Sequence, residues 1–445
     1  MLNQIILGAG PSGLSYALFN NKTLILEKNS HPGGHASSFF INGFTFDYGP
    51  HILFSKDQDI LNFIISSLGK NVQKCKRNNK VSYKNKLVKY PFENDLASLD
   101  PDDNYECIHS FIFNQYKIKY KKPKNMKEWF LYTFGSGISN KYLIPYNEKV
   151  WNIPVEKLSM VWADRIPNPP ISDVLKSSIG IKTEGYKHQL YYHYPKKGGY
   201  QAISDTWAKS CNIKFNEEIT KITLGKSYLL IQTSKESYKA KIIISTINLS
   251  SLLKACADWV PRKILQAYEK LIVNPMFVIS LGIKGEDKDL FTALYFSDKD
   301  FLVNRVSFPR TFSSENAPPG HYSIQAEITY RAGSAISKMK DNEIIKHVIN
   351  GLRQRNLING EIILTDIKRL GESYVVYDVS YEKNIRIIRE FFTEKNIHLL
   401  GRFSFFEYIN IDMAVNRSIL LRQSLSPNVS KKQLLKKALL KIRSN

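Results

Sequence analysis

The chain has 445 residues, of which 43% are hydrophobic and 12% aromatic, a composition typical of a globular protein and not of a disordered one. This length exceeds what one hydrophobic core usually serves, so two or three domains are expected. The net charge of +23 favours anionic partners such as nucleotide-linked substrates or acidic membranes. No zinc finger, basic zipper or RNA-binding motif accompanies the charge, so nucleic acid is not an expected partner.

The apolar runs and the cysteines indicate the cellular compartment in which the protein is expected. No apolar run reaches about 18 residues, so no transmembrane helix is expected. The first residues already read as a strand, so no signal peptide is expected either. The four cysteines are scattered without a Cys-x-x-Cys pair, at Cys75, Cys107, Cys211 and Cys256. We therefore expect a reduced, cytoplasmic protein with neither disulfides nor a metal site.

The first elements predicted along the chain are a short strand, a glycine turn and a helix. Residues 4–7 form an apolar run typical of a buried parallel strand, and the residues after the turn have helical spacing. In dinucleotide-binding loops the first glycine makes the tight turn, the second admits a pyrophosphate, and the third lets helix and strand pack closely. The residues of this loop are Gly8, Gly10, Pro11, Ser12 and Gly13.

A second apolar run, residues 23–26, predicts the next parallel strand, which ends in Glu27. A carboxylate at this place can accept hydrogen bonds from a ribose, and a helix N-terminus after Gly10 offers unpaired N–H groups to phosphates. The pattern therefore predicts a dinucleotide site. A strand, turn and helix without any ligand is the alternative.

The residues after Glu27 distinguish between dinucleotides. Lys28 leads into a second glycine turn in "KNSHPGGHASSF", which contains Gly33, Gly34 and His35. This arrangement resembles the FAD-binding group that includes amine oxidases, protoporphyrinogen oxidases and UDP-galactopyranose mutases. The resemblance implies that the cofactor is FAD and not NAD, and that these residues lead the chain along it.

The remaining elements predict a cofactor domain that is split in sequence. Residues 211–246 alternate in strand fashion, and 396–403 read as a last buried strand before a helix from about 411. Residues 100–180 read as mostly helical, and 264–390 as an antiparallel sheet. We expect an α/β fold, with a Rossmann-like FAD-binding domain, an inserted helical segment and an antiparallel β-sheet substrate domain. The expected boundaries are 1–75 with 195–263 and 391–429 for the FAD-binding domain, 100–194 for the helical segment, 76–99 with 264–390 for the substrate domain, and 430–445 for a basic C-terminal helix.

Five further segments, in the correct order, resemble UDP-galactopyranose mutase. They are "DYGPHILFSKD", "YKNKLVKYPFEND", "PYNEKVWNIPVEKLSMVWADRIP", "YPKKGGYQAIS" and "LLGRFSFFEYINIDMAV". The resemblance implies attack by N5 of reduced FAD on the anomeric carbon of a nucleotide sugar, followed by pyranose–furanose isomerisation without net redox change. NAD(P)H or another external reductant would supply the electrons.

The resemblance also implies substrate-side residues, since the developing charge on a diphosphate needs cations. Arg305 occupies the region of a diphosphate-binding arginine, with Arg310 as second choice. Trp151 and Tyr146 would line the substrate-side helix, and the segment with Tyr374 and Tyr377 would bring a tyrosine to the diphosphate. A solvated arginine and ordinary aromatic core residues are the alternatives.

Other candidate residues lie where the chain would pass the cofactor. His51 follows Gly49 and could hydrogen-bond the flavin or a sugar hydroxyl, unless it is simply a turn histidine held by backbone. Gly401 and Arg402 follow the last predicted strand, close to the expected phosphates. Asp412 and Met413 begin the final helix, where an acid is favourable in any case. We expect Gly49, His51, Gly401, Arg402, Asp412 and Met413 to bind the cofactor.

The C-terminal segment 430–443 predicts a basic amphipathic helix. Leu434, Leu435, Ala438, Leu439 and Ile442 have helical spacing, and lysines fill the other face. Ser430 and Gln433 match a capping box. Such a helix could lie on the anionic inner face of a membrane, or it could dock on its own protein.

The expected function is that of an FAD-dependent, mutase-like enzyme that acts on a nucleotide-linked sugar in surface polysaccharide biosynthesis. The sugar is not fixed, because "DRIPNPP" lacks an arginine of the prokaryotic mutases and Phe54 replaces a second histidine. The alternative is an FAD-dependent oxidoreductase of the amine oxidase or protoporphyrinogen oxidase type. A flavin-binding partner without catalysis is a third hypothesis.

Overall fold

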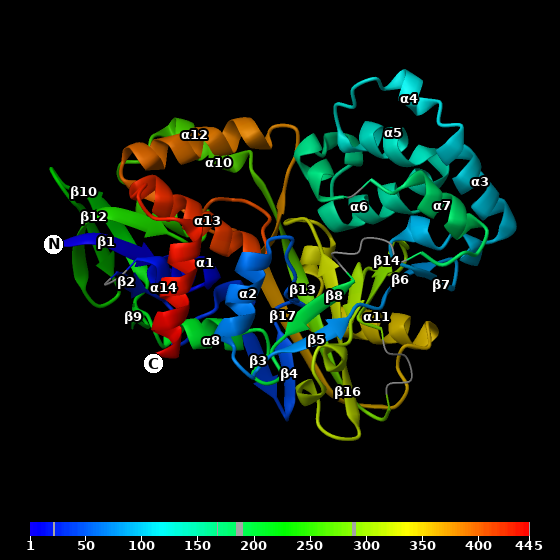
Figure 1. The fold of residues 1–445 in the computed structure, drawn as a ribbon, viewed down its shortest axis with the longest axis horizontal. Helices are drawn as coiled ribbons and strands as arrows, with labels where there is room; N and C mark the ends of the chain where they lie inside the picture. The colour runs from blue at the N-terminus through cyan, green and yellow to red at the C-terminus, as the bar shows by residue number, and fades with distance from the viewer. Residues whose placement is uncertain (21–22, 167, 184–189, 287–290, 445) are drawn as a thin grey trace.

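The fold is built on two seven-stranded sheets that lie next to each other, with a group of helices beyond the second sheet (Figure 1). The computed structural model describes residues 1–20, 23–166, 168–183, 190–286 and 291–444. In the part of the chain so described, no helix is long and apolar enough to cross a membrane. The two sheets meet along the line where the functional residues gather.

The first sheet has a parallel centre flanked by an antiparallel hairpin. Its strands run in the order β10 (Ile219–Leu224), β11 (Leu229–Thr233), β12 (Ser237–Ser245), β1 (Leu2–Leu7), β2 (Leu24–Leu26) and β9 (Asn212–Lys214), while β18 (Ile397–Leu399) pairs with the end of β12. The parallel strands β1, β2, β12 and β18 end at the same edge, which is where open α/β sheets bind their ligands.

Helices cover both faces of this sheet, as the alternation of its side chains requires. Ile6 and Ile244 point to a layer that contains α1 (Pro11–Phe19), α2 (Gln58–Ser67), α8 (Ala202–Ala208), α13 (Ile411–Leu425) and α14 (Lys431–Arg443). Ile5 and Ile243 point to the opposite layer, with α9 (Leu249–Ala255), α10 (Arg262–Glu269) and α12 (Tyr381–Glu394). The strands are buried on both sides, which explains why they read as continuous apolar runs.

The second sheet is antiparallel except where β14 pairs with β6. Its order is β17 (Glu361–Val376), β13 (Ile272–Lys284), β16 (His321–Thr329), β15 (Arg305–Ser307), β14 (Ala293–Phe296), β6 (Asn79–Tyr83) and β7 (Lys86–Lys89). On one face, side chains such as Phe277 and Ile279 pack with Ile344 and Val348 of α11 (Asp341–Gln354). Two small two-stranded antiparallel sheets complete the described strands: β3 (Ser38–Ile41) forms a hairpin with β4 (Phe44–Asp47), and β5 (Gln73–Lys76) pairs with the distant β8 (Tyr191–Tyr194). The predicted fold class is confirmed.

The helical segment stands beyond the second sheet (Figure 1). It contains α3 (Pro101–Ile112), α4 (Tyr116–Lys119), α5 (Met126–Ile138), a π-helical turn (Ser139–Leu143), α6 (Ile144–Trp151) and α7 (Ile171–Ser178). Two glycines let α3 and α5 touch: a Cβ on Gly135 would lie 2.2 Å from the Ser110 carbonyl oxygen, and one on Gly137 would lie 2.6 Å from the Cα of Cys107. Larger residues at these places would push the two helices apart.

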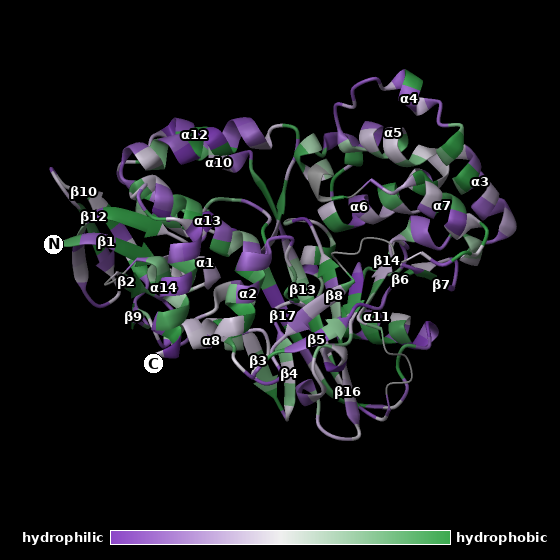
Figure 2. Cartoon of the chain, in the orientation of Figure 1, coloured by the Kyte–Doolittle hydropathy of each residue, from purple (hydrophilic) through white to green (hydrophobic). Residues whose placement is uncertain are grey.

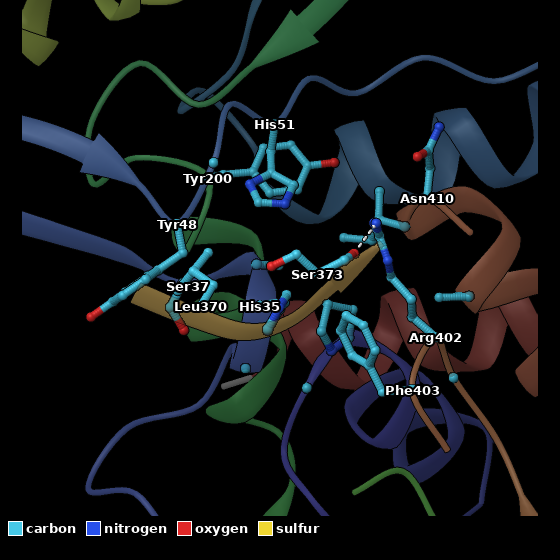
Figure 3. A pocket seen from close by; sticks show the side chains of 18 of the residues that line it. His35, Ser37, Tyr48, His51, Tyr200, Leu370, Ser373, Arg402, Phe403 and Asn410 are labelled. Carbon is cyan, nitrogen blue, oxygen red and sulfur yellow. Dashed lines mark hydrogen bonds between the residues drawn. The ribbon is translucent and has the colours of Figure 1, made fainter. Parts of the chain in front are cut away.

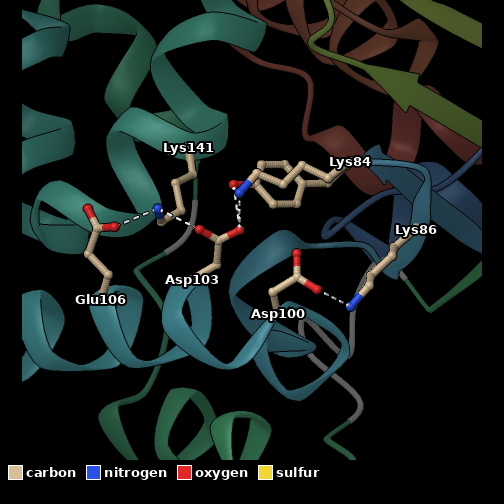
Figure 4. Close-up of polar contacts among 7 residues, drawn as sticks. Lys84, Lys86, Asp100, Asp103, Glu106 and Lys141 are labelled. Carbon is tan, nitrogen blue, oxygen red and sulfur yellow. Dashed lines mark hydrogen bonds and ion pairs between the residues drawn. The ribbon is translucent and has the colours of Figure 1, made fainter.

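A cluster of charges joins this segment to the second sheet (Figure 4). The Asp103 carboxylate on α3 accepts from Lys84 in the β6–β7 turn at 2.7 Å and from Lys141 in the π-helical turn at 2.9 Å. Lys141 also reaches Glu106 at 2.6 Å, and the Tyr83 hydroxyl lies 3.1 Å from Asp103. The Asp103 side chain is only 9% exposed, so its charge depends on these partners.

The C-terminal helix α14 docks on its own protein. Leu434, Leu435, Ala438 and Ile442 are buried, and the helix contacts α1 and α2. The capping box forms, with the Gln433 N–H 3.3 Å from the Ser430 hydroxyl and the Ser430 N–H 2.9 Å from the Gln433 side-chain oxygen. Because the apolar face is covered, a membrane could meet only the lysine side of the docked helix, and contact through this helix stays a prediction.

Replacing Asp103 with asparagine should destabilise the protein by about 1–3 kcal/mol, the range for losing hydrogen bonds to a charged, buried group. Burial alone would raise the pKa of Asp103, but the hydrogen bonds from Lys84 and Lys141 outweigh it and lower the pKa to about 2. The folded pKa therefore lies below the ordinary value of 3.8, so this stabilisation is present above about pH 4 and is lost as the pH falls toward 2. Denaturant unfolding of wild type and Asp103→Asn across this range measures it.

The matched control is Asp100→Asn, since Asp100 pairs with Lys86 at 2.7 Å but both side chains are well exposed. Exposed pairs of this kind contribute little, so the control should unfold like wild type. Equal losses in the two variants would contradict the role assigned to the Asp103 cluster.

Candidate functional site

A cavity of about 790 Å³ lies between the carboxyl edge of the first sheet and the inner face of the second. One wall consists of the loops that follow β1, β2, β12 and β18, which contribute Gly8–Ser12, Glu27–Asn29, Thr246–Asn248 and Gly401–Phe403. The facing wall consists of side chains from β6, β13, β14, β15, β16 and β17. The two walls differ in chemistry: the first presents glycine-loop backbone together with the side chains of Glu27 and Arg402, whereas the second presents the side chains of its strands.

Glycines allow the loops of the first wall to approach one another. A Cβ on Gly13 would lie 2.1 Å from the Gly8 carbonyl oxygen, and one on Gly8, which has φ +97°, would lie 2.6 Å from the Thr246 hydroxyl. Gly10 differs, because a Cβ there would meet no protein atom within 4 Å. The space in front of Gly10 is therefore open to a ligand, as the sequence pattern predicts for the second glycine.

The N-terminus of α1 faces this space. The helix begins at Pro11, its N-cap is Gly10, and no side chain caps it. Its first N–H groups and the positive end of its dipole are therefore oriented for an anion. Glu27 lies beside it: one carboxylate oxygen accepts from the Ala9 N–H at 2.7 Å and the other from the Asn29 N–H at 2.9 Å. Glu27 thus holds the loop and still lines the cavity.

The second glycine turn closes against the first. The Gly33 N–H donates to the Ala9 carbonyl at 2.9 Å, and a Cβ on Gly34 would lie 3.6 Å from the Cα of Gly10. The following His35 places Nε2 2.5 Å from the Glu372 carbonyl oxygen on β17. This turn therefore links the loop of the first sheet to the edge strand of the second.

Polar side chains gather around the middle of the cavity (Figure 3). The His51 ring stacks on Tyr200, with centroids 5.2 Å apart. Arg402 donates to the Ser373 carbonyl at 2.6 Å and lies 4.2 Å from the Tyr408 ring. Among the residues that the structure describes, no hydrogen-bond partner is found for three buried polar atoms of this group: His51 Nδ1, Arg402 Nε and the Ser373 hydroxyl. Such atoms point to a polar ligand that fills the cavity.

Two of the histidines that line the cavity, His35 and His51, are held neutral. Burial, followed by the charge of Arg402, lowers the pKa of His35 to about 4 and that of His51 to about 3. His51 can therefore act as a neutral hydrogen-bonding group near pH 7 and not as a cation.

The facing wall carries an ion pair in which the carboxylate is fully buried and the guanidinium is partly exposed to the cavity. Arg305 on β15 and Glu327 on β16 are directly opposite in the antiparallel register. Arg305 Nη2 donates to Glu327 at 2.9 Å, and Nε donates to the second carboxylate oxygen. Burial works against the charged form of Arg305, but Glu327, Tyr374 and Tyr295 together raise its pKa well above the ordinary value. The wall is thus polar and carries a permanent cation.

Most of the residues predicted for the site line this cavity. They are Gly8, Gly10, Pro11, Ser12, Glu27, Lys28, Gly34, His35, Gly49, His51, Arg305, Tyr374, Gly401 and Arg402. Gly13 and Gly33 lie behind the lining, where they let the loops pack. Asp412 and Met413 lie in the first turn of α13 and are not on the cavity wall, although their neighbours Ile411 and Ala414 are.

Trp151 is not on the wall, and its predicted contact with substrate does not fit its position. Its indole is buried, donates to the Asn147 side chain at 3.1 Å, and packs edge-on against Tyr374 and Tyr408. Trp151 therefore supports two tyrosines that do line the cavity. The second-choice Arg310 donates to the His321 carbonyl at 2.9 Å, and Tyr377 and Tyr146 are likewise outside the lining.

Several lining residues were not predicted from the sequence. They include Tyr48, Tyr200, Tyr295, Glu327, Ser373 and Asn410. Tyr200 lies in the "KKGGY" turn, and the buried Asp47 carboxylate fixes that turn by accepting the Tyr200 N–H at 3.0 Å. The glycine pair was a usable signal for Tyr200. The sequence around Glu327 offered no comparable signal, because Glu327 lies in a strand recognised only by its alternation of apolar and polar residues.

Comparison with known proteins identifies the class. The family of flavin-containing amine oxidoreductases matches residues 17–359, and the chain belongs to that family. The coproporphyrinogen III oxidase of Staphylococcus aureus is 23% identical over 433 residues, covering 86% of this chain and 90% of the relative. The chain is thus a flavoenzyme that binds FAD.

Solved structures share the fold. A reduced UDP-galactopyranose mutase superposes with a TM-score of 0.88 at 21% identity, covering 99% of both chains. A structure described as a protoporphyrinogen oxidase from an Exiguobacterium species gives a TM-score of 0.76 at 14% identity, covering 96% of this chain and 99% of the other. The predicted superfamily is confirmed.

The residues present fit FAD. The open space before Gly10, the uncapped start of α1 and the carboxylate of Glu27 suit a pyrophosphate and a ribose. The unpartnered atoms of His51, Arg402 and Ser373 suit the hydrogen-bonding edges of a flavin. We infer that these residues hold the cofactor.

Gly10→Ala should fold normally but bind FAD at least about tenfold more weakly, because its methyl group would occupy the space of the pyrophosphate. A tenfold weaker affinity corresponds to about 1.4 kcal/mol of binding free energy. Flavin absorbance per chain and the thermal midpoint without cofactor measure the two effects. The control is Gly371→Ala, because a Cβ on Gly371 also meets no atom within 4 Å but lies outside the cavity lining. A Gly10→Ala protein that binds FAD like wild type would refute this placement.

The FAD-free protein should lose stability as the pH falls from about 6.5 to 4. The folded pKa values of His35 and His51 lie below the ordinary 6.5, so in this window the unfolded chain binds protons that the folded chain does not. Denaturant unfolding at several pH values measures the slope. A double variant, His35→Gln with His51→Gln, should show a shallower slope, and an unchanged slope would rule out this origin.

Proposed function

We propose that this flavoenzyme acts on a nucleotide-linked sugar and interconverts its pyranose and furanose forms with the flavin in its reduced state. The observation that carries the proposal is the polar wall opposite the cofactor loops, where Arg305 lies among Tyr295, Tyr374 and Glu327. The likeness to a reduced UDP-galactopyranose mutase, with a TM-score of 0.88 against 0.76 for the oxidase described above, supports it.

Arg305 can serve a diphosphate while it remains paired. A guanidinium has five N–H donors in a planar fork. Glu327 takes two of them, one on Nε and one on Nη2. The pair therefore holds the guanidinium side-on and leaves its other N–H groups for a further anion. A diphosphate gains from this fixed cation because negative charge builds on it as the nucleotide leaves.

The phenol of Tyr374 would add a neutral donor. Burial is the main reason that its pKa is raised well above the ordinary value, and Glu327 acts in the same direction. The hydroxyl stays protonated and can donate to a phosphate oxygen. Trp151 and Tyr408 pack against its ring and hold it in place.

When bound, reduced FAD supplies a nucleophile through its N5 for the anomeric carbon. The residues of this chain bind and orient the substrate. Neutral His51, stacked on Tyr200, is placed to hydrogen-bond the flavin or a sugar hydroxyl. Biosynthesis of surface polysaccharide in the cytoplasm is the setting in which we expect this reaction.

A second candidate is net oxidation of the kind named for the coproporphyrinogen III oxidase relative. The similarity to that relative, 23% identity over 433 residues, favours it. An oxidase of this type would be expected to present a more apolar surface over the flavin than the wall with Asn79, Thr292, Tyr295 and Arg305.

The deciding experiment incubates dithionite-reduced protein with UDP-, GDP-, CDP- and dTDP-sugars and separates the ring forms by chromatography. Conversion of one sugar, with no oxygen uptake and no consumption of reductant per turnover, is the expected result. Absence of binding and conversion across the panel, together with substrate-dependent flavin reduction by a porphyrinogen or an amine, would establish the second candidate instead.

The variant Arg305→Gln with Glu327→Gln removes both charges at once and so leaves no buried charge unpaired. We expect nucleotide-sugar binding to weaken by about 2–5 kcal/mol, the range for losing a buried charged contact. FAD content should stay unchanged. Calorimetric titration measures the affinity, with Arg310→Gln as control because Arg310 lies outside the cavity lining. Wild-type affinity for the nucleotide sugar in the double variant would show that Arg305 does not bind the substrate.

A further inference from the structure

The outer end of the helical segment exposes large apolar side chains. We call residues 112–124, which include the end of α3 and all of α4, the α4 tip. Phe113 is 70% exposed and Ile118 is 80% exposed, and Ile112 beside them is also exposed. Figure 1 shows α4 at the outer end of the helical segment, and Figure 2 shows hydrophobic and hydrophilic residues next to each other on it. The tip is far from the cavity walls and is not part of the site described above.

The same tip is strongly basic. Between Glu106 and Glu128 the sequence contains six lysines and no acidic residue. Five of them belong to the tip and are exposed: Lys117, Lys119, Lys121, Lys122 and Lys124. Within the described ranges of the chain, none of these five forms an ion pair, whereas Lys127 beyond them lies 3.9 Å from Glu156. The surface therefore carries a concentrated positive charge that the protein does not neutralise.

The tip is held in place and presents these residues outward. Asn114, buried between α3 and α4, donates to the carbonyls of Leu131 and Tyr132 on α5 at 3.0 Å each. Its side-chain oxygen accepts from the Tyr116 N–H at 3.0 Å. The Tyr116 and Tyr120 rings stack, with centroids 5.8 Å apart. Phe113 and Ile118 thus stand exposed on an ordered turn.

We propose that the α4 tip docks on an anionic lipid membrane. Phe113 and Ile118 would enter the boundary between headgroups and acyl chains, and the lysines around them would contact anionic headgroups. The exposed apolar side chains and the lysines together favour a lipid membrane as the partner of this tip. A nucleic acid would satisfy the lysines but gives aliphatic Ile118 little apolar surface, and a second copy of the tip would bring two unneutralised lysine clusters together.

The C-terminal helix is the other basic amphipathic element, and it differs in one respect. Its Leu434, Leu435 and Ala438 are buried against the protein, and among the described residues of this helix only Leu440 is a well-exposed large apolar side chain, at 58%, whereas the α4 tip exposes Ile112, Phe113 and Ile118. The proposal does not rest on the proposed function, since membrane docking concerns a surface and not the reaction.

The test is co-sedimentation of the full-length, FAD-loaded protein with vesicles of phosphatidylcholine alone or with phosphatidylglycerol added. We expect binding only to the anionic vesicles, weakening as salt is raised. Phe113→Ser with Ile118→Ser should lower the partition coefficient at least tenfold, and so should Lys117→Gln with Lys119→Gln and Lys122→Gln. Flavin absorbance and thermal midpoint of these surface variants should match wild type, which shows that they fold.

The matched control replaces three lysines of α14, Lys432→Gln with Lys436→Gln and Lys437→Gln, and should bind vesicles like wild type. An equal loss in this control would overturn the proposal, because binding would then follow net charge alone. Tight binding to duplex DNA that the Phe113 and Ile118 changes leave intact, with no binding to vesicles, would also overturn it and assign the tip to nucleic acid.

Discussion

The close approach of three loops at the carboxyl edge of the parallel sheet is the constraint on which the site depends. A Cβ on Gly13 would lie 2.1 Å from the Gly8 carbonyl oxygen. One on Gly8 would lie 2.6 Å from the Thr246 hydroxyl, and one on Gly401 would lie 2.7 Å from the Ser12 hydroxyl. The loops after β1, β12 and β18 can therefore pack this closely only because these three positions carry no side chain. Their packing sets the start of α1 and leaves Gly10 facing open space, which is the place for the FAD pyrophosphate.

The two sheets contribute different chemistry to one cavity. The parallel sheet offers backbone N–H groups, a helix terminus and the Glu27 carboxylate, which suit a cofactor that many proteins bind in the same way. The antiparallel sheet offers side chains, above all the pair formed by Arg305 and Glu327 on adjacent strands. We infer that cofactor and substrate meet along the line where the two sheets adjoin, where Ser373 of the second sheet also faces the cofactor side.

The sequence predicted features that depend on short-range patterns. The glycine loop lies within six residues, and β13, β16 and α14 follow from hydrophobic periodicity and a capping box, so the fold class could be predicted and is confirmed. Glu327 could not be found, because its pairing with Arg305 depends on the register of β15 and β16, 22 residues apart. Periodicity showed an apolar face on α14 but not what covers it. For Trp151 the family resemblance implied a substrate contact, whereas its buried indole packs against Tyr374. The roles of the lining residues remain predictions.

The central claim is that one cavity holds FAD on the loops of the parallel sheet and a nucleotide-linked sugar on the Arg305 wall. A crystal structure of the reduced, FAD-loaded protein soaked with the nucleotide sugar that binds best would test it most directly. We expect the pyrophosphate of FAD before Gly10, the flavin beside His51, and the substrate diphosphate within hydrogen-bonding distance of Arg305. A substrate bound elsewhere, with nothing but solvent on the Arg305 wall, would contradict it.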